Sequence, residues 1–465
     1  MPQLTATAVK TWSGALSRWG AWREAAWITG GQLVGAVGAL IGVRLLTGVL
    51  DPGTYGELAL ALTAATLAFQ VILGPLVNAA ERFFAPARET GQTPAFFSAL
   101  RRLTLSAAGL MVAIGLIAAG ALLLVGRTEW LPLTLGAVLF GFLSGCESIL
   151  DGVQNAARQR SVVAIHQGIR QWLRPVLAVV LIASVLQASW VGMLAYCLAS
   201  SAILGSQFWY FRRTLRRLGL SQSSSAATHT VELRMLTYAA PFGIWGLFTW
   251  LQMSSDRWAV QLVGSSADVG LYAIVAQLGA YPLTLIGAML FQVAAPIAYA
   301  QAGAGSDPVR TQAAIRTCAA LALGLAAAVV LLTLTTMLLH QQLFALAVGA
   351  QYQSVSAFLP VAVLSSGLFV VAQTLSLVPM VLGDSRSLLA PKVLTAMLAV
   401  ALNIGGAYLF GLPGVFWAGV LYSISYLLWL AILVRRMAAR HYQIANRPRI
   451  LKRPSAILAD APSCP

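Results

Sequence analysis

Long apolar runs separated by short polar breaks make up most of this chain. Because a helix needs roughly 20 apolar residues to cross the hydrocarbon of a bilayer, each run of that length predicts a transmembrane helix. The runs predict about twelve helices, at residues 26–49, 57–79, 103–125, 131–150, 174–187, 190–211, 237–263, 270–299, 313–338, 357–382, 389–410 and 414–434. We therefore expect an all-α, multi-pass membrane protein.

The composition supports this expectation. Of the 465 residues, 58% are hydrophobic and only 9% are charged, whereas charged residues make up about 25% of a typical soluble domain. A soluble chain of this length could not cover its surface with so few polar groups. The composition thus excludes a soluble globular protein.

The basic residues indicate how the chain lies in the membrane. If the amino terminus is cytoplasmic and the helices alternate in direction, every Lys and Arg except Arg44, Arg127 and Arg257 falls in or beside a cytoplasmic segment. This is the asymmetry that membrane insertion produces. It predicts that both termini are cytoplasmic, and it explains the net charge of +16 without a nucleic-acid partner.

A polar stretch near the middle of the chain, containing SQSSSAATHT, divides the predicted helices into two groups of six. The first residues carry Trp12, Leu16, Trp19 and Trp22 at helical spacing, which is typical of an amphipathic helix in the headgroup layer. The predicted segments are an interfacial segment at 1–25, lobes at 26–211 and 237–434 around a central cavity, a linker at 212–236 and a basic tail at 435–465.

An internal repeat links the two predicted lobes. The stretch RLLTGVLDPGTYGELALA at 44–61 and the stretch RWAVQLVGSSADVGLYAIVA at 257–276 share one order of features. In each, an Arg near a helix end is followed by apolar residues, a polar turn and a glycine, Gly56 or Gly270. Both copies follow the first helix of a lobe, which favours a parallel repeat of the kind found in two-lobed transporters.

Two adjacent charges, Asp256 and Arg257, interrupt the apolar run of the seventh predicted helix. A charge at the centre of a bilayer costs roughly 2.5–3.5 kcal/mol on insertion scales. Asp256 lies far enough along its helix to sit near the outer end, where it can reach water or a cavity. It is either a proton or ion site or a structural partner of an arginine.

Several strings resemble one family. The Asp-Arg pair followed by VGLYA at 269–273 resembles the seventh and eighth helices of the Wzx-type polysaccharide flippases, in the multidrug/oligosaccharidyl-lipid/polysaccharide exporter superfamily. The string at 44–61 looks like the first turn of that family. LDGVQNAARQR at 150–160 is similar to its basic loop after the fourth helix, and PGVFWAGV at 413–420 to its twelfth-helix entry.

The resemblance implies a flippase in the bacterial inner membrane rather than an enzyme. Its substrate would be a polyprenyl-diphosphate-linked oligosaccharide, moved to the periplasmic leaflet for exopolysaccharide, capsule or O-antigen. Coupling to protons or sodium, contact with membrane lipids and other polysaccharide assembly proteins as partners are expected for the family. The candidate residues are Arg44, Arg82, Arg174 and Arg257 for the diphosphate, Asn78 and Gln277 for sugar hydroxyls, and Asp256 and Glu147 for coupling or gating.

Each candidate also has a structural interpretation. The positive-inside rule already accounts for Arg82 and Arg174, and Arg44 and Arg257 could reach the membrane interface from helix ends. Glu147 could be a solvated helix end, and the amides could bridge helices. The four cysteines are widely spaced, so neither a metal nor another cofactor is expected.

Two other functions stay open. A drug or cation exporter would share the fold. The intramembrane charges are mostly basic, however, which favours an anionic cargo. A polysaccharide polymerase or ligase would call for a large outer catalytic loop, and the sequence shows only short outer breaks.

Overall fold

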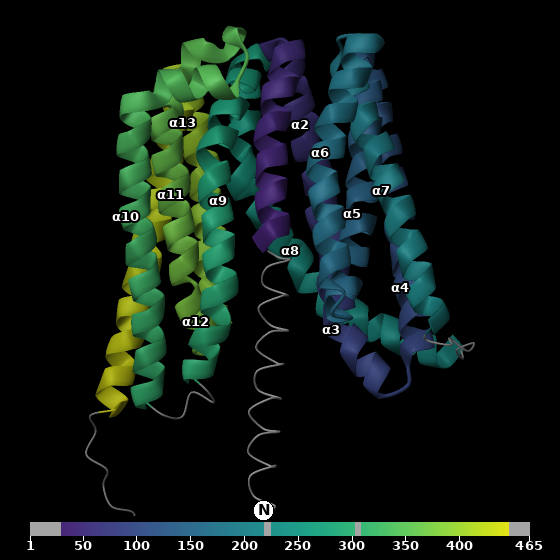
Figure 1. Ribbon diagram of the computed structural model, residues 1–465, viewed down its shortest axis with the longest axis vertical. Helices are drawn as coiled ribbons and strands as arrows, with labels where there is room; N and C mark the ends of the chain where they lie inside the picture. The colour runs from purple at the N-terminus through teal and green to yellow at the C-terminus, as the bar shows by residue number, and fades with distance from the viewer. Residues whose placement is uncertain (1–28, 218–224, 303–307, 446–465) are drawn as a thin grey trace, which may run out of the picture.

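The computed structural model describes residues 29–217, 225–302 and 308–445. Within them the chain is a bundle of long helices (Figure 1). The elements are a first helix at Thr29–Val49, α2 (Pro52–Ala68), η1 (Phe69–Leu73), α3 (Gly74–Glu89), α4 (Thr93–Val125), η2 (Thr128–Trp130), α5 (Leu131–Ala156), α6 (Arg160–Ser184), α7 (Ser189–Arg217), α8 (Ser225–Val263), α9 (Ser266–Ala302), α10 (Pro308–Ala347), η3 (Ala350–Phe358), α11 (Leu359–Leu375), α12 (Leu377–Val381), η4 (Ser385–Leu388) and α13 (Leu389–Ala445).

All twelve predicted spans correspond to observed helices. The last two lie on either side of Gly411, where α13 has the non-helical angles φ 63° and ψ −143°. Glycine adopts a positive φ at little cost, and Pro413 follows two residues later, so the chain breaks and turns here. Another irregularity is η1, a short π-helix that joins α2 to α3.

Nine stretches of the described chain are long and apolar enough to cross a membrane, and the stretch Arg386–Arg440 contains the kink at Gly411. Helices α6 and α8 are outside this set, and both carry charges along their length, among them Arg170 and Arg174 in α6. The fold class predicted from the sequence, an all-α polytopic membrane protein, is confirmed.

Figure 1 shows α2 to α7 on one side of the bundle and α9 to α13 on the other, with α8 running between them. One large hydrophobic cluster nevertheless contains residues from both groups, including Val43, Leu58, Val269 and Phe416. The groups therefore share a core at one end of the molecule, and the division into two lobes stays a prediction.

The helices extend into the expected linker and tail. Helix α7 continues to Arg217 and α8 begins at Ser225, so much of the stretch 212–236 is helical. Helix α13 continues to Ala445 into the predicted tail. The predicted interfacial segment at 1–25 and the tail beyond residue 445 lie outside the described residues.

Candidate functional site

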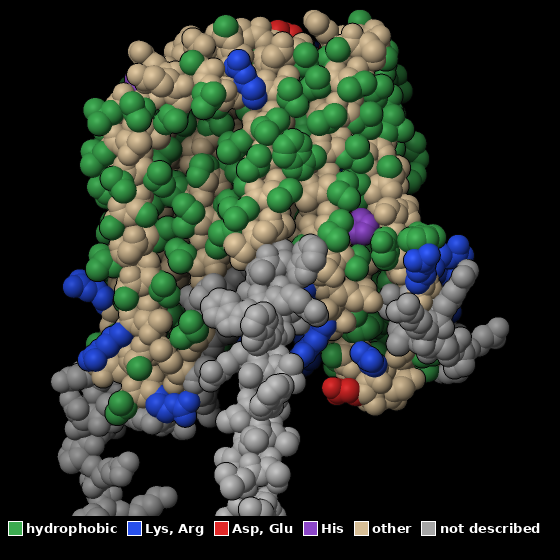
Figure 2. All heavy atoms as spheres, viewed as in Figure 1, with side chains coloured by type: hydrophobic (Ala, Val, Ile, Leu, Met, Phe, Trp, Pro, Cys, Tyr) green, Lys and Arg blue, Asp and Glu red, His purple; other side chains and the backbone are tan. Residues whose placement is uncertain are grey.

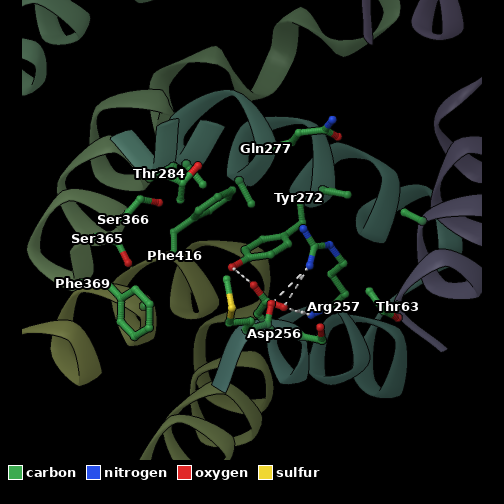
Figure 3. A pocket seen from close by; sticks show the side chains of 18 of the residues that line it. Thr63, Asp256, Arg257, Tyr272, Gln277, Thr284, Ser365, Ser366, Phe369 and Phe416 are labelled. Atoms are coloured by element: carbon green, nitrogen blue, oxygen red, sulfur yellow. Dashed lines mark hydrogen bonds and ion pairs between the residues drawn. The ribbon is translucent and has the colours of Figure 1, made fainter. Parts of the chain in front are cut away.

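A cavity of about 410 Å³ lies where α2, α8, α9, α11 and α13 meet, so helices from both groups form its wall. It contains three of the residues singled out in the sequence, Asp256, Arg257 and Gln277. Figure 3 shows these side chains around the open space. The structure thus brings together the two members of the charged pair and one predicted sugar-binding amide; their binding roles stay predictions.

The charged corner of the cavity is held by a tyrosine. The Tyr272 hydroxyl donates a hydrogen bond of 2.9 Å to Oδ2 of Asp256, as Figure 3 shows. The other oxygen, Oδ1, lies 3.8 Å from an Arg257 guanidinium nitrogen, and both charged side chains stay about one-fifth exposed. Asp256 is therefore fixed in place, whereas Arg257 keeps an open side toward the cavity.

The rest of the lining mixes uncharged polar groups with aromatic rings. The Tyr55 hydroxyl donates to Oε1 of Gln277 at 3.1 Å, which joins α2 to α9. Phe416 lies 4.7 Å from Tyr272, centroid to centroid. Besides the tyrosines, the lining has the aliphatic hydroxyls of Thr63, Thr66, Ser254, Thr284, Ser365 and Ser366. Such a wall can accept hydrogen-bonding groups and apolar ring faces together.

Helix α8 is fastened to α2 beside this cavity. The indole nitrogen of Trp250 donates to the Thr63 carbonyl at 2.7 Å, and that of Trp258 donates to the Thr63 hydroxyl at 3.0 Å. Gly246 contributes as well, because a side chain there would come within 2.3 Å of the Gln70 carbonyl oxygen. These contacts place Asp256 and Arg257 opposite α2.

Arg44 lies outside the cavity lining, near the end of the first helix that leads into α2. Its guanidinium donates to the Val348 carbonyl and, at 3.4 Å, to the Ala345 carbonyl, where α10 ends. A cation suits a helix carboxyl end, which carries unpaired carbonyls. Nearby, the Tyr352 hydroxyl donates to the Leu50 carbonyl at 2.9 Å. Arg44 thus joins the first helix to α10.

The two copies of the sequence repeat meet at this same end. A β-carbon on Gly56 would lie 1.8 Å from the Ser266 carbonyl oxygen, and one on Gly270 would lie 1.9 Å from the Pro52 carbonyl oxygen. Only glycine allows backbones to come so close. We call this region, residues 44–56 with 266–270 and 345–352, the upper contact; Figure 1 shows it at the top of the bundle.

Glu147 and Arg174 are brought together, but within α5, α6 and α7 rather than in the cavity. Glu147 is fully buried, and its Oε2 lies 2.8 Å from Arg174 and 2.7 Å from Arg170. Arg170 also pairs with Asp151 at 3.0 Å. We call Glu147, Asp151, Arg170 and Arg174 the buried charge cluster. Glu147 is therefore not the solvated helix end of the alternative interpretation, because its side chain is buried and ion-paired. The members of the cluster face one another, which favours a structural role for Glu147 and Arg174 over contact with a substrate.

Two other predicted residues, Arg82 and Asn78, lie on α3 outside the cavity lining. Arg82 is exposed, as the positive-inside interpretation expects. Asn78 is half-buried. The structure does not bring either residue to the cavity, and their proposed binding roles stay predictions.

Comparison with known proteins shows the family to which the chain belongs. A family model described as "Polysaccharide biosynthesis protein" matches residues 21–299, more than half of the chain. The chain belongs to this family. None of the curated proteins matches it significantly.

Solved transporter structures resemble the chain across most of its length. The lipid II flippase MurJ, in an inward closed conformation, superposes with a TM-score of 0.68 at 11% identity, over 89% of this chain and 90% of that chain. An outward-facing multidrug resistance MATE transporter of the MOP superfamily gives 0.59 at 16%, over 90% and 96%. The MATE transporter VcmN of Vibrio cholerae, in its bent form, gives 0.58 at 15%, over 90% and 98%. This chain therefore has the fold of these transporters.

The structure also reveals three charged residues whose surroundings were not predicted from the sequence. The charge pattern puts Lys392 in or beside a cytoplasmic segment. In the structure its side chain is only 4% exposed within α13 and donates to Oε1 of Gln252 at 2.6 Å. Its position one residue after Pro391, inside a predicted span, was the available signal. Asp151 and Arg170 likewise fall outside the predicted spans, although helical spacing aligns Arg170 with Arg174 on one face.

Proposed function

We propose that this chain moves a polyprenyl-diphosphate-linked oligosaccharide from the cytoplasmic to the outer leaflet by alternating access. The observation that carries the proposal is the cavity between the two helix groups, whose lining combines a partly exposed arginine with hydroxyls, the amide of Gln277 and aromatic rings. Membership in the polysaccharide biosynthesis family supports a saccharide cargo.

The chemistry of such a substrate matches the cavity. A diphosphate cannot enter hydrocarbon without groups that replace its hydration. A guanidinium stays charged and binds phosphate oxygens with two parallel hydrogen bonds. In this proposal the diphosphate displaces Asp256 from Arg257, while Tyr272 holds the freed carboxylate. Gln277 and the serine and threonine hydroxyls bind the first sugars.

The charge distribution supports the proposed orientation. On the face shown in Figure 2, basic side chains gather toward the lower end of the molecule. By the positive-inside rule this end is cytoplasmic. The upper contact then closes the outer side. We place the protein in a bacterial inner membrane with both termini inside, and reporter fusions at each terminus test that placement.

The runner-up is export of a small organic cation, as the likeness to MATE transporters suggests. A cation carrier needs an acidic group that its cargo can neutralise. The acid of this cavity, Asp256, already has Arg257 and Tyr272 as partners. A cationic cargo would have to displace Arg257 from this acid, whereas an anionic cargo binds Arg257 and leaves the acid bonded to Tyr272, so the pairing favours an anionic cargo.

Surface polysaccharide in cells tests the proposal. We expect Arg257→Ala to reduce polymer at least tenfold at matched protein level, because the cavity then lacks its guanidinium, and Arg257→Lys to retain part of it. Arg127→Ala is the matched control, because Arg127 is exposed, lies outside the cavity lining and pairs with Glu129 at 3.7 Å. Full polymer from the Arg257→Ala strain would contradict the assignment.

Coupling is a further part of the proposal. We expect an inward proton or sodium gradient to accelerate transport in sealed vesicles, with Asp256 as the coupling residue. Asp256→Asn should make the rate independent of both gradients. A variant that still responds to one of them would move coupling to another group.

A further inference from the structure

Two hollows at the lower end of the N-terminal helices adjoin each other and differ in chemistry. One is an apolar groove of about 830 Å³ between the first helix and α6, lined by Gly30, Val34, Gly168, Ile169 and Trp172 among others. The other, of about 680 Å³, is polar, and it is bordered by the first helix, α3, α5 and α6. Ala164 lines both, so the hollows meet at that residue.

The polar hollow has the side chains that bind sugar hydroxyls. Gln32, Asn155 and Gln167 each offer an amide donor and acceptor, Glu81 offers carboxylate oxygens, and Arg160 adds a positive charge. Oε1 of Gln32 is buried and meets no donor among the described residues. A buried amide oxygen without a donor costs free energy, which a bound hydroxyl group would recover.

Above Ala164, the first helix and α6 pack closely along a seam that separates the groove from the interior. The first helix places glycines against α6, so that a β-carbon on Gly38 would lie 2.6 Å from the Trp172 indole nitrogen and one on Gly42 would lie 2.7 Å from Pro175. Trp172 also donates to the Val34 carbonyl at 3.1 Å. The hollows meet below this seam, near the Gly31–Ala164 contact.

We infer that these hollows form a loading site, separate from the central cavity, at which the lipid-linked oligosaccharide first binds. The sugar head lies in the polar hollow and the polyprenyl chain lies in the groove. This inference rests on the proposed function. An amphiphile with a large hydroxylated head fits the pair of hollows, whereas the small head of a phospholipid leaves most of the amide lining without partners.

The position agrees with the order of events. Gln32 belongs to the first turn of the first helix, Asn155 lies in the last turn of α5 and Arg160 begins α6, so the site lies at the end that the proposed orientation makes cytoplasmic. A lipid-linked oligosaccharide made on that side meets this site before the central cavity.

A photoactivatable probe tests the groove. The full chain is placed in vesicles with a long-chain polyprenyl phosphate that carries a diazirine on its prenyl chain, and labelled peptides are mapped by mass spectrometry. We expect labels in residues 30–34 and 164–176, displaced by unlabelled polyprenyl phosphate at a concentration at which diacyl phospholipid does not displace them. Equal displacement by phospholipid would assign the groove to ordinary membrane lipid and overturn the inference.

Matched glycine variants sharpen this test. A β-carbon on Gly168 meets only Val34, at 3.8 Å, so Gly168→Trp fills the groove. The control is Gly109→Trp on α4, where a β-carbon meets nothing within 4 Å. Labelling should fall at least tenfold in Gly168→Trp and stay unchanged in Gly109→Trp. Unchanged labelling in both would contradict the site, as would a photoreactive residue at Ile169 that links instead to residues 1–25.

The polar hollow has its own readout. In wild type, a sugar-bearing polyprenyl diphosphate should displace the photoprobe more effectively than bare polyprenyl phosphate does. Gln32→Leu and Asn155→Leu should each reduce the ratio of these two potencies by fivefold or more. An unchanged ratio would remove the head from this hollow. Wild-type protein that supports surface polymer without labelling the groove would overturn the loading site alone. Labelling without any effect of Arg257→Ala on polymer would overturn the cavity assignment instead.

Discussion

The Asp256–Arg257 pair and the buried charge cluster contain the same side-chain types but are built differently. In the cluster, the carboxylate of Glu147 is fully buried and lies 2.7 and 2.8 Å from two arginines. In the cavity, Asp256 and Arg257 are 3.8 Å apart and about one-fifth exposed. The charges of the cluster are paired with one another, whereas the cavity leaves a cation that a ligand can reach.

This difference distinguishes structural from functional charges in the same membrane protein. Removing one member of a buried ion pair leaves its partner without compensation, and the penalty falls on folding. Removing a partly solvated charge costs little stability, and its loss is felt when a substrate must be bound. Stability and transport measurements on the two groups should therefore respond in opposite ways.

The largest expected effect comes from breaking the cluster. Glu147→Ala leaves Arg170 and Arg174 without their shared carboxylate, and such losses cost about 3–5 kcal/mol of stability. We expect a marked fall in the thermal unfolding temperature of detergent-solubilised protein. Arg257→Ala serves as the comparison and should unfold close to wild type; a larger loss in Arg257→Ala than in Glu147→Ala would invert the two roles.

The next effect concerns the upper contact. Gly270→Ala inserts a β-carbon 1.9 Å from the Pro52 carbonyl oxygen, so α2 and α9 must separate. Overpacking of this kind costs about 1–3 kcal/mol. A cysteine at Thr63 in the cavity, on a background without the native cysteines, should then react several-fold faster with a membrane-impermeant maleimide added outside. Gly120→Ala, where nothing lies within 4 Å, is the control; equal rates in the two would contradict an outer closure.

The smallest effect tests how Asp256 is held. Tyr272→Phe removes the hydrogen bond of 2.9 Å to Asp256, worth roughly 1 kcal/mol. The freed carboxylate can approach Arg257 more closely and compete better with a phosphate. Transport measured against substrate concentration should show a several-fold higher half-saturation with an almost unchanged maximum rate. Unchanged half-saturation would remove Tyr272 from this role.

The sequence predicted the helices well because bilayer crossing demands long apolar runs, and all twelve predicted spans lie in or overlap observed helices. It also drew attention to Asp256 and Arg257, since both interrupt such a run, but their place in one cavity came from the structure. It could not predict which charges pair, because Glu147 and Arg174 meet only when α5 packs against α6. Similarly, the repeat drew attention to Gly56 and Gly270, but their contact across the bundle depends on how α2 and α9 cross.

Direct translocation in reconstituted vesicles tests the central claim, that Arg257 in the cavity carries the diphosphate of a lipid-linked oligosaccharide across the membrane. Purified protein is placed in liposomes with such a lipid, and the fraction of sugar heads that a membrane-impermeant glycosidase can reach is followed over time. We predict protein-dependent translocation by wild type and Arg127→Ala, and at least a tenfold slower rate for Arg257→Ala. Equal rates for wild type and Arg257→Ala would contradict the claim.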